Sequence, residues 1–331
     1  MIVTVTPNPS VDRTVYLDTL VVGSVNRSPR SWSEPSGKGV NVALALHRYR
    51  ERVRAILPAG GSVGAQLLQM LATADLDTVV VPIAGEVRSN ISLTRPDGTV
   101  TKVNEAGPVI ADDEVDRLLA AVSADIAAAS WLVCGGSLPA GAPTDLYARL
   151  TDLARAHGVS VVVDSSGPPL AASLPAGPDL VKPNTHELAE LVGHPLHTLG
   201  EVVDAAQEVR RRGAGAVLAS LGADGAVLVD RDGALHGEAP VETVVSTVGA
   251  GDAMLAGYLA GRRSRREALA TALCWGATAV QNEGTLFTPP RSNTWCTLHD
   301  EIDRERRVRD DEPAPTSPAA VLDGPGLRTR A

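Results

Sequence analysis

The feature that constrains this chain most is a repeated alternation of short apolar runs with amphipathic stretches of helical length. The runs are rich in β-branched residues and apolar throughout, as strands are when both faces of their sheet are buried. The stretches between them carry apolar residues at the spacing of one helix face. The alternation predicts an α/β fold in which a mostly parallel central sheet lies between two layers of helices.

The expected elements can be placed on the sequence by these patterns and by the turn residues between them. Strands are expected at Ile2–Thr6, Val53–Leu57, Thr78–Val81, Ser130–Cys134, Val159–Asp164, Leu180–Lys182 and Ala216–Ser220. Helices are expected after Lys38 and at Gly64–Ala74, Asp112–Ala128, Thr144–His157 and Glu201–Arg212. A hairpin is expected over residues 226–238, where two apolar runs flank a polar turn.

Two segments, residues 11–34 and 88–105, break this rhythm by alternating polar and apolar residues around turn signals such as Pro96-Asp97-Gly98. They predict a small antiparallel sheet that stands off the main one as a lid. Residues 304–331 are charged and then rich in Pro, Ala and Thr without periodicity, so we expect a disordered tail. Residues 1–303 are expected to form one domain.

Composition excludes several functional classes. A net charge of −9 and an aromatic content of 3 % do not favour nucleic-acid binding. The three cysteines lack metal-ligand spacing, which suits a reducing cytoplasm. No apolar stretch approaches the roughly 20 residues of a membrane helix, and the first residues lack a signal-peptide pattern. We therefore expect a cytoplasmic protein that binds neither membrane nor nucleic acid.

The lysines are unusually few and fall in informative places. Of the 30 basic residues only Lys38, Lys102 and Lys182 are lysines. An acidic protein that binds phosphates must concentrate positive charge locally, and lysine and arginine are not interchangeable at a phosphate. Lys38 and Lys182 lie in segments that other features also single out.

The strongest motif is Thr247–Met254, T-V-G-A-G-D-A-M, which leads into a helical run. Small residues before a helix let backbone N–H groups approach an anion, and the helix dipole favours negative charge there. In that position Asp252 could accept the proton of an attacking hydroxyl, while Gly249, Ala250 and Gly251 form an anion hole. The alternative is a simple helix cap. Neither a Walker A loop nor a G-x-G-x-x-G fingerprint after the first strand is present.

Three further segments suit phosphate or metal chemistry. In S-G-K-G-V-N (36–41), Lys38 and Asn41 lie within one helical turn and can face one ligand. In K-P-N-T-H-E (182–187), Asn184 and Glu187 offer oxygen ligands for a hydrated Mg²⁺ ion. The strand end S-L-G-A-D-G (220–225) suits a nucleotide phosphate. Taken alone, S-G-K-G-V-N is equally well explained as a glycine-rich capping turn. The alternative for K-P-N-T-H-E is a plain helix start, and the alternative for S-L-G-A-D-G is a turn.

Together and in this order, these motifs and N-P-S-x-D (8–12) resemble the ribokinase-like carbohydrate kinases of the phosphofructokinase-B type. The resemblance covers roughly residues 1–290. It implies a three-layer α/β sandwich with a small β lid, and ATP and Mg²⁺ as cofactors. It also implies phosphorylation of a sugar phosphate, with D-fructose 1-phosphate giving fructose 1,6-bisphosphate as the first choice of reaction. Tagatose 6-phosphate and fructose 6-phosphate are the alternative acceptors.

The resemblance also implies which residues form the site. Asp252 would be the general base, with Gly249, Ala250 and Gly251 around the transferred group. The nucleotide would contact Lys182, Asn184, Ser220, Gly222 and Gly225, and Asn184 and Glu187 would approach Mg²⁺ through water. The sugar phosphate would contact Asp12, Arg27, Gly37, Lys38, Asn41, Arg88, Asn90 and Ser137. Arg27 resembles a lid arginine that reaches the phosphate across a dimer interface, which implies a homodimer formed through the lid.

The sequence departs from the family pattern at Ser36, where relatives usually have glycine, and a side chain there would narrow the sugar pocket. Two other classes of protein share this kind of fold. A non-catalytic sugar-phosphate or nucleotide-binding regulator has no need of the intact G-A-G-D segment. A dinucleotide-dependent oxidoreductase fits the sheet but would need the fingerprint that is absent after the first strand.

Overall fold

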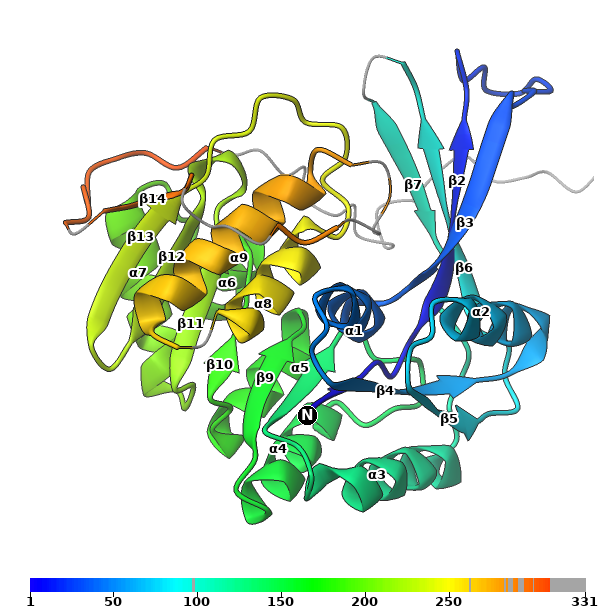
Figure 1. The fold of residues 1–331 in the computed structure, drawn as a ribbon, viewed down its shortest axis with the longest axis horizontal. Coiled ribbons are helices and arrows are strands. Elements are labelled where there is room, and N and C mark those ends of the chain that lie inside the picture. Colours follow the sequence, from blue (N-terminus) through cyan, green and yellow to red (C-terminus); the bar gives the residue numbers. More distant parts are fainter. Residues whose placement is uncertain are drawn as a thin grey trace, which may run out of the picture.

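The computed structural model describes residues 1–96, 99–261, 263–282, 284, 288–290, 295–299 and 301–309, in which the strands form two sheets (Figure 1). The larger sheet contains β1 (Ile2–Val5), β4 (Val53–Ala59), β5 (Thr78–Pro82), β8 (Trp131–Gly135), β9 (Ser160–Asp164), β10 (Leu180–Val181), β11 (Ala216–Ser220), β12 (Ala226–Asp230), β13 (Gly233–Glu238) and β14 (Thr297–His299). The smaller sheet contains β2 (Ser10–Tyr16), β3 (Arg30–Ser36), β6 (Arg88–Thr94) and β7 (Val100–Asn104).

The α-helices of the described residues are α1 (Lys38–Arg48), α2 (Gly61–Thr73), α3 (Asp112–Ile126), α4 (Leu146–Ala156), α5 (Gly167–Ser173), α6 (Thr185–Val192), α7 (Leu199–Arg211), α8 (Ala250–Ala260) and α9 (Arg265–Ala279). The helices α5 and α9 and the strand β14 were not expected from the sequence. The helix α6 was expected only as a helix start in the K-P-N-T-H-E segment, and the strands of the smaller sheet only as two lid segments. The elements with predicted bounds agree with them to within a few residues at their ends.

The main sheet is parallel over most of its width. Its strand order is β14-β13-β12-β11-β10-β9-β8-β1-β4-β5, and every neighbouring pair from β11 to β5 is parallel. The strands β12, β13 and β14 continue it in antiparallel pairing, which confirms the hairpin expected over 226–238. In such a sheet the carboxyl ends of all the parallel strands meet at one edge, which is where ligands bind in open α/β folds.

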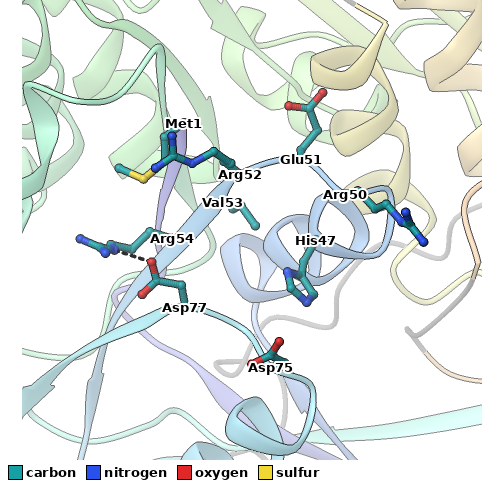
Figure 2. A pocket seen from close by; sticks show the side chains of 9 residues that line it. All are labelled: Met1, His47, Arg50, Glu51, Arg52, Val53, Arg54, Asp75 and Asp77. Atoms are coloured by element: carbon teal, nitrogen blue, oxygen red, sulfur yellow. Dashed lines mark hydrogen bonds and ion pairs between the residues drawn. The ribbon is translucent and has the colours of Figure 1, made fainter.

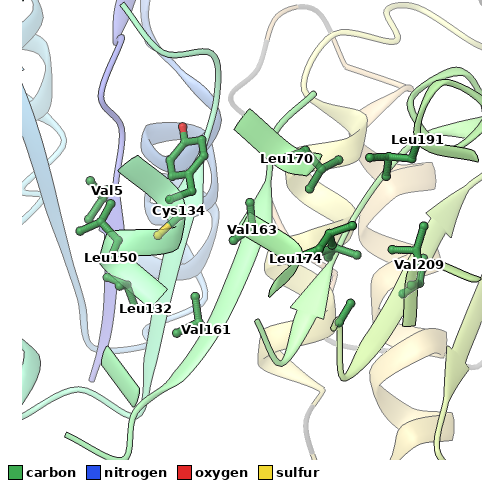
Figure 3. Close-up of a cluster of buried hydrophobic side chains, with 14 of the residues drawn as sticks. Val5, Leu132, Cys134, Leu150, Val161, Val163, Leu170, Leu174, Leu191 and Val209 are labelled. Atoms are coloured by element: carbon green, nitrogen blue, oxygen red, sulfur yellow. The ribbon is translucent and has the colours of Figure 1, made fainter. Parts of the chain in front are cut away.

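Both faces of the sheet are buried, as the uniformly apolar runs predict. In β9, Val161 and Val163 belong to one hydrophobic cluster and Val162 belongs to the other. Helices α3 to α7 contribute side chains to the first cluster, part of which is drawn in Figure 3. Helices α1, α2, α8 and α9 contribute to the second. The two helical layers follow from the two-residue period of each strand.

The smaller sheet is formed by the two segments predicted as a lid, and it stands away from the main sheet (Figure 1). Its strand order is β3-β2-β6-β7. The expectation of a purely antiparallel sheet is wrong, because β2 pairs with β6 in parallel. This pairing places Asp12 beside Asn90, while β3 places Glu34 on its other side. Residues 97–98 of the expected turn lie outside the described residues.

Residues 304–309 differ from the expected disordered tail, because they are packed along the start of α7. The N–H groups of Leu199 and Gly200 donate to carbonyl oxygens of Arg306 and Arg304, each at 2.9 Å. Residues 310–331 of the expected tail lie outside the described residues. Within the described ranges no helix is both long and apolar enough to cross a membrane.

Candidate active site

The carboxyl ends of β9 and β10 and the first turns of α1 and α8 bring the charged residues of the site together. Asp164 is the last residue of β9, and Lys182 directly follows β10. Lys38 is the first residue of α1, and Asp252 lies in the first turn of α8. The predicted grouping of Lys38, Lys182 and Asp252 is therefore present in space.

Asp252 is a buried carboxylate with 8 % of its surface exposed. Its Oδ2 accepts a hydrogen bond of 2.7 Å from Nδ2 of Asn41 on α1. Burial and repulsion by Asp164 raise its pKa to about 6, although Lys38, Asn41 and Lys182 act in the opposite direction. A carboxylate with this pKa is still ionised at neutral pH, yet it is a stronger base than an exposed aspartate.

Asp164 bridges the two lysines, and sequence analysis had assigned it no role. It is fully buried. Its Oδ1 lies 2.5 Å from Nζ of Lys38, and its Oδ2 lies 3.1 Å from Nζ of Lys182. Burial alone would raise the pKa of Asp164, but the attraction of Lys182 and Lys38 outweighs it and lowers the pKa. The signal for this residue was its position as a carboxylate that ends a buried parallel run, V-V-V-D (161–164).

Lys182 lies against the glycine-lined turn at the start of α8. Gly249 is the N-cap of α8 with a φ of 78°, and the predicted anion hole, Gly249 to Gly251, forms its first turn. A Cβ atom on Gly251 would lie 3.1 Å from Nζ of Lys182. The backbone N–H groups of a helix start and a buried ammonium group thus face the same small volume, an arrangement that favours a phosphoryl group.

Gly37 fixes how α1 enters the site. Its φ of 122° is in the region that glycine adopts without strain, and a Cβ atom there would lie 2.6 Å from Cγ2 of Thr6. The chain can therefore turn directly beneath the carboxyl end of β1. Lys38 and Asn41 follow within one turn, with Lys38 toward Asp164 and Asn41 toward Asp252.

On the side of the smaller sheet, Asp12 lies at the centre of a polar cluster. Its Oδ1 accepts from Ser10 at 2.7 Å and from Asn90 at 2.9 Å, and its Oδ2 accepts from Ser36 at 2.8 Å. Oδ1 of Asn90 and Oδ1 of Asn41 are buried acceptors for which the described residues provide no hydrogen bond. Such orphan acceptors suit the hydroxyl groups of a sugar.

Arg88 and Ser137 lie at the junction between the two sheets and share Asn8 as a partner. The Arg88 guanidinium donates to the carbonyl oxygens of Asn8 and Glu105, each at 3.1 Å. The Asn8 side chain donates to Oγ of Ser137 at 3.2 Å. Both residues predicted to contact the sugar phosphate are thus tied to the same loop after β1.

The predicted nucleotide segments are adjacent in space. Asn184 and Ser220 form an isolated parallel bridge, and the Ser220 N–H donates to the Pro183 carbonyl at 3.0 Å. Gly222 and Gly225 flank the short turn that follows β11, where their φ values are 56° and 80°. The carboxyl ends of β10 and β11 thus bring together the K-P-N and S-L-G-A-D-G segments.

Asn184 and Glu187 form a capping box at the start of α6, which was the alternative to a metal site. Oδ1 of Asn184 accepts from the Glu187 N–H at 2.7 Å, and Oε2 of Glu187 accepts from the Asn184 N–H at 2.9 Å. The other carboxylate oxygen, Oε1, is 3.7 Å from Nζ of Lys38. The described residues contain no cluster of three or more His, Cys, Asp or Glu that could hold a metal ion directly.

Arg27 is the one predicted site residue that the structure leaves away from the others. It is exposed in the connection between β2 and β3, beyond the pair Tyr16 and Arg30. Asp12 lies at the other end of the same hairpin. Within a single chain, Arg27 therefore does not join the cluster around Asp12.

A separate pocket of about 480 Å³ is drawn in Figure 2. Its lining residues precede or begin β1, β4 and β5, which places the pocket at the amino ends of these strands, opposite to the candidate site. Its charges are mixed in sign, and Arg54 donates to Asp77 at 2.9 Å within it. The residues that line it are Met1, His47, Arg50, Glu51, Arg52, Val53, Arg54, Asp75 and Asp77. None of them belongs to the candidate site.

A parallel sheet with a detached small sheet, and a buried carboxylate at a glycine-lined helix start, define the ribokinase-like class of α/β proteins. A structure of ribokinase from Arabidopsis thaliana complexed with ribose and ATP has the same fold. Its TM-score is 0.70 at 21 % identity, over 86 % of this chain and 93 % of that one.

Within that class, the chain belongs to the pfkB family of carbohydrate kinases, whose family model matches residues 5–291. It is 37 % identical to a 1-phosphofructokinase of Haemophilus influenzae, over 84 % of this chain and 90 % of the relative. It is also similar to phosphofructokinase-2 of Escherichia coli in complex with potassium, with a TM-score of 0.81 and 33 % identity. That match covers 86 % of this chain and 94 % of the other. The protein is therefore a sugar-phosphate kinase, a phosphotransferase with a hydroxyl acceptor, and family membership implies ATP as the donor.

Proposed function

We propose that this kinase phosphorylates D-fructose 1-phosphate with ATP to give fructose 1,6-bisphosphate. The relatives named 1-phosphofructokinase, at 34 to 39 % identity over most of the chain, support this choice of acceptor. The observation that carries the chemistry is the buried Asp252, which lies at a helix start beside two lysines.

In the proposed reaction the free hydroxyl oxygen of the sugar phosphate attacks the γ-phosphorus of ATP. The new O–P bond forms as the bond to the β–γ bridging oxygen breaks, and ADP leaves. Asp252 accepts the hydroxyl proton, and Asn41 holds the carboxylate through its 2.7 Å hydrogen bond. Lys182 and the N–H groups of the Gly249–Gly251 turn stabilise the charge on the transferred phosphoryl oxygens.

On the sugar side, we assign the hydroxyl contacts to Asp12 and Asn90, and the phosphate contacts to Lys38 and Arg88. The buried orphan oxygens of Asn90 and Asn41 support this assignment, since a bound hydroxyl would satisfy them. Gly37 and Ser137 line the same region. On the nucleotide side we assign Lys182, Asn184, Ser220, Gly222 and Gly225.

The residues present fit Mg²⁺ that is held mainly by ATP and water. The capping box occupies Asn184 Oδ1 and Glu187 Oε2. Glu187 Oε1 lies outside the box, 3.7 Å from Nζ of Lys38, and is the oxygen that we assign to a hydrated ion. When bound with the nucleotide, Mg²⁺ would neutralise phosphate charge. A cytoplasmic location fits a kinase that uses ATP.

The test is a screen of phosphosugars for ATP consumption, with the position of the new phosphate determined by NMR. The proposal expects fructose 1-phosphate to have the highest kcat/KM. A clear preference for an unphosphorylated sugar or a nucleoside would show that Lys38 and Arg88 do not bind a substrate phosphate.

A second acceptor, fructose 6-phosphate, is favoured by the likeness to the E. coli phosphofructokinase-2, one structure of which is in complex with fructose 6-phosphate. Tagatose 6-phosphate is the third choice in the same screen. Ser36 affects the choice of sugar because its hydroxyl donates a hydrogen bond to Oδ2 of Asp12, an oxygen that a sugar hydroxyl would otherwise contact. Replacing Ser36 with glycine should widen the pocket and narrow the gap in kcat/KM between the three sugars.

We also propose that the protein acts as a homodimer joined through the smaller sheet. The connection between β2 and β3 exposes apolar side chains, with Val22 at 91 % and Val25 at 81 % exposure. Arg27 lies in the same connection, far from the Asp12 of its own chain. A second copy would cover the valines and could receive Arg27 in its sugar site.

A further inference from the structure

Residues 302–309, here called the C-terminal strap, dock against the start of α7. The Leu199 and Gly200 N–H groups donate to strap carbonyls, and the Val308 N–H donates to the His197 carbonyl at 3.0 Å. The first N–H groups of a helix have no partner inside the helix. The strap therefore supplies two acceptors for the first turn of α7, and the Thr198 side chain supplies another through the Glu201 N–H.

The strap approaches α7 closely at Gly200, which has no side chain. A Cβ atom on Gly200 would lie 2.8 Å from the Arg304 carbonyl oxygen, so the strap approaches the helix where no side chain intervenes. Ile302 and Val308 are half-buried and pack against the first hydrophobic cluster. The strap lies beyond residue 291, where the match to the family model ends.

The far end of the strap pairs with Asp224, a carboxylate that is 2 % exposed. Arg306 Nη2 lies 3.0 Å from its Oδ1, and the Arg309 N–H donates to its Oδ2 at 2.7 Å. Among the described residues, every hydrogen bond and ion pair of this carboxylate comes from the strap. A buried carboxylate without partners is costly, so Asp224 and the strap hold each other in place.

Arg306 extends this connection to the end of β13. Its guanidinium also donates to Oε1 of Glu238, and this hydrogen bond is the main reason why the pKa of Glu238 is lowered to about 2. At neutral pH one arginine thus links two carboxylates from different elements. Asp224 itself belongs to the Ser220–Gly225 loop, where the Leu221 N–H donates to the Gly225 carbonyl at 2.9 Å.

We propose that the C-terminal strap, through Arg306, holds the Ser220–Gly225 loop in the position that receives the nucleotide. Arg306 is then a positioning residue for ATP, beyond the residues that the family model matches. This inference rests on the proposed function only in placing ATP at that loop.

The test compares Arg306→Ala with Arg304→Ala in the full-length protein. Both variants remove one arginine from the strap, but Arg304 pairs with Asp204 on α7 and not with the loop. For Arg306→Ala we expect the Kd for ADP and the KM for ATP to rise on the order of two- to tenfold. The KM for the sugar phosphate and kcat should stay within about twofold, as is expected when only nucleotide binding weakens. Arg304→Ala should leave all four quantities near the wild-type values.

A lower Tm for Arg306→Ala with an unchanged Kd for ADP would overturn the inference, because the strap would then be only structural. Arg306→Lys keeps the charge but lacks the fork that reaches both carboxylates, so its Kd for ADP should lie between wild type and Arg306→Ala. If the alanine variant does not fold, a wild-type Kd in the lysine variant overturns the inference instead. ADP binding is measured without sugar, so a wild-type protein that binds ADP but phosphorylates no sugar phosphate fails only the proposed function.

Discussion

At the scale of single residues, the site depends on two carboxylates whose pKa values are shifted in opposite directions by their surroundings. Asp164 and Asp252 are both buried, yet the pKa of Asp164 is lowered and that of Asp252 is raised to about 6. The pKa values differ because Asp164 directly contacts both lysines, whereas Asp252 accepts a hydrogen bond from the neutral side-chain amide of Asn41. One carboxylate is thus a fixed counter-ion, and the other is left able to take a proton.

Replacing Asp252 with asparagine should separate catalysis from stability. We expect kcat to fall by about 10²–10⁴-fold or more, with sugar-phosphate binding largely retained.

Because the raised pKa of Asp252 destabilises the ionised form in the folded state, the wild-type protein loses stability as pH rises from about 4 through about 6. Asp252→Asn should therefore be more stable than wild type at pH 8 by on the order of 1–3 kcal/mol, and similar at pH 4. Urea unfolding at the two pH values measures this difference, and equal gaps at both would contradict it.

The pKa itself can be measured in the free protein, away from the titration of the substrate phosphates. The ¹³C carboxyl resonance that disappears in Asp252→Asn identifies the group. We expect its titration midpoint near pH 6. A midpoint near the ordinary aspartate value would contradict the burial and repulsion that raise the pKa of Asp252.

Removing the charge of Asp164 should cost stability rather than only activity. In Asp164→Asn, Lys38 and Lys182 lose their common partner, and breaking a buried pair costs about 3–5 kcal/mol. Asp77→Asn is a matched control, since it breaks the exposed pair with Arg54, which is worth at most about 1 kcal/mol. Chemical denaturation of the three proteins gives the comparison, and equal losses would show that burial of the Asp164 pair is unimportant.

The proximity of single residues could be predicted where chemistry and a local pattern coincided, while their roles stay predictions. Asp252, Lys38, Asn41 and Lys182 stand at glycine-lined or strand-terminal positions, and the structure brings them together. Asp164 was missed because its partners are distant in sequence, and a strand-terminal aspartate has no local motif.

At the scale of elements, the position of α1 depends on the backbone at Gly37. In Gly37→Ala the new Cβ would meet Thr6 at 2.6 Å in a conformation that alanine rarely adopts, so α1 must shift. Because this helix carries Lys38 and Asn41, we expect kcat/KM to fall on the order of 10²-fold.

Gly158→Ala is the control for backbone strain alone. Gly158 also has a positive φ, 69°, but a Cβ atom there would meet no atom within 4 Å beyond its own chain neighbours. It should lose about 1–2 kcal/mol of stability and keep its activity. Steady-state kinetics and thermal unfolding decide, and equal activities in the two variants would show that α1 tolerates displacement.

The elements themselves were largely predictable, because the uniformly apolar strands and amphipathic helices leave few alternatives. The pairing of β2 with β6 was not, since these strands are separated by more than 70 residues and only tertiary contacts set their direction. The strap was missed for a related reason. Its sequence is polar and charged, and its order comes from α7 and Asp224 rather than from any local periodicity.

At the scale of the whole molecule, the proposed dimer can be tested by mixing two defective proteins. If Arg27 serves the site of the other subunit, Arg27→Ala and Asp252→Asn each have impaired sites, but a mixed dimer contains one complete site. Random exchange of subunits should then restore about a quarter of wild-type activity. No recovery after exchange, shown to be complete by mass spectrometry, would contradict a shared site.

The place of β1 in the main sheet has a consequence for how the chain reaches this architecture. β1 lies between β4 and β8, and its register pairs Ile2 with Val53 on one side and Trp131 on the other. After β1 has paired with β4, its other edge still exposes unpaired N–H and C=O groups until β8, a segment far along the chain, pairs with it. Such a distant closure is entropically slow, so refolding should pass through an intermediate with an open, association-prone edge.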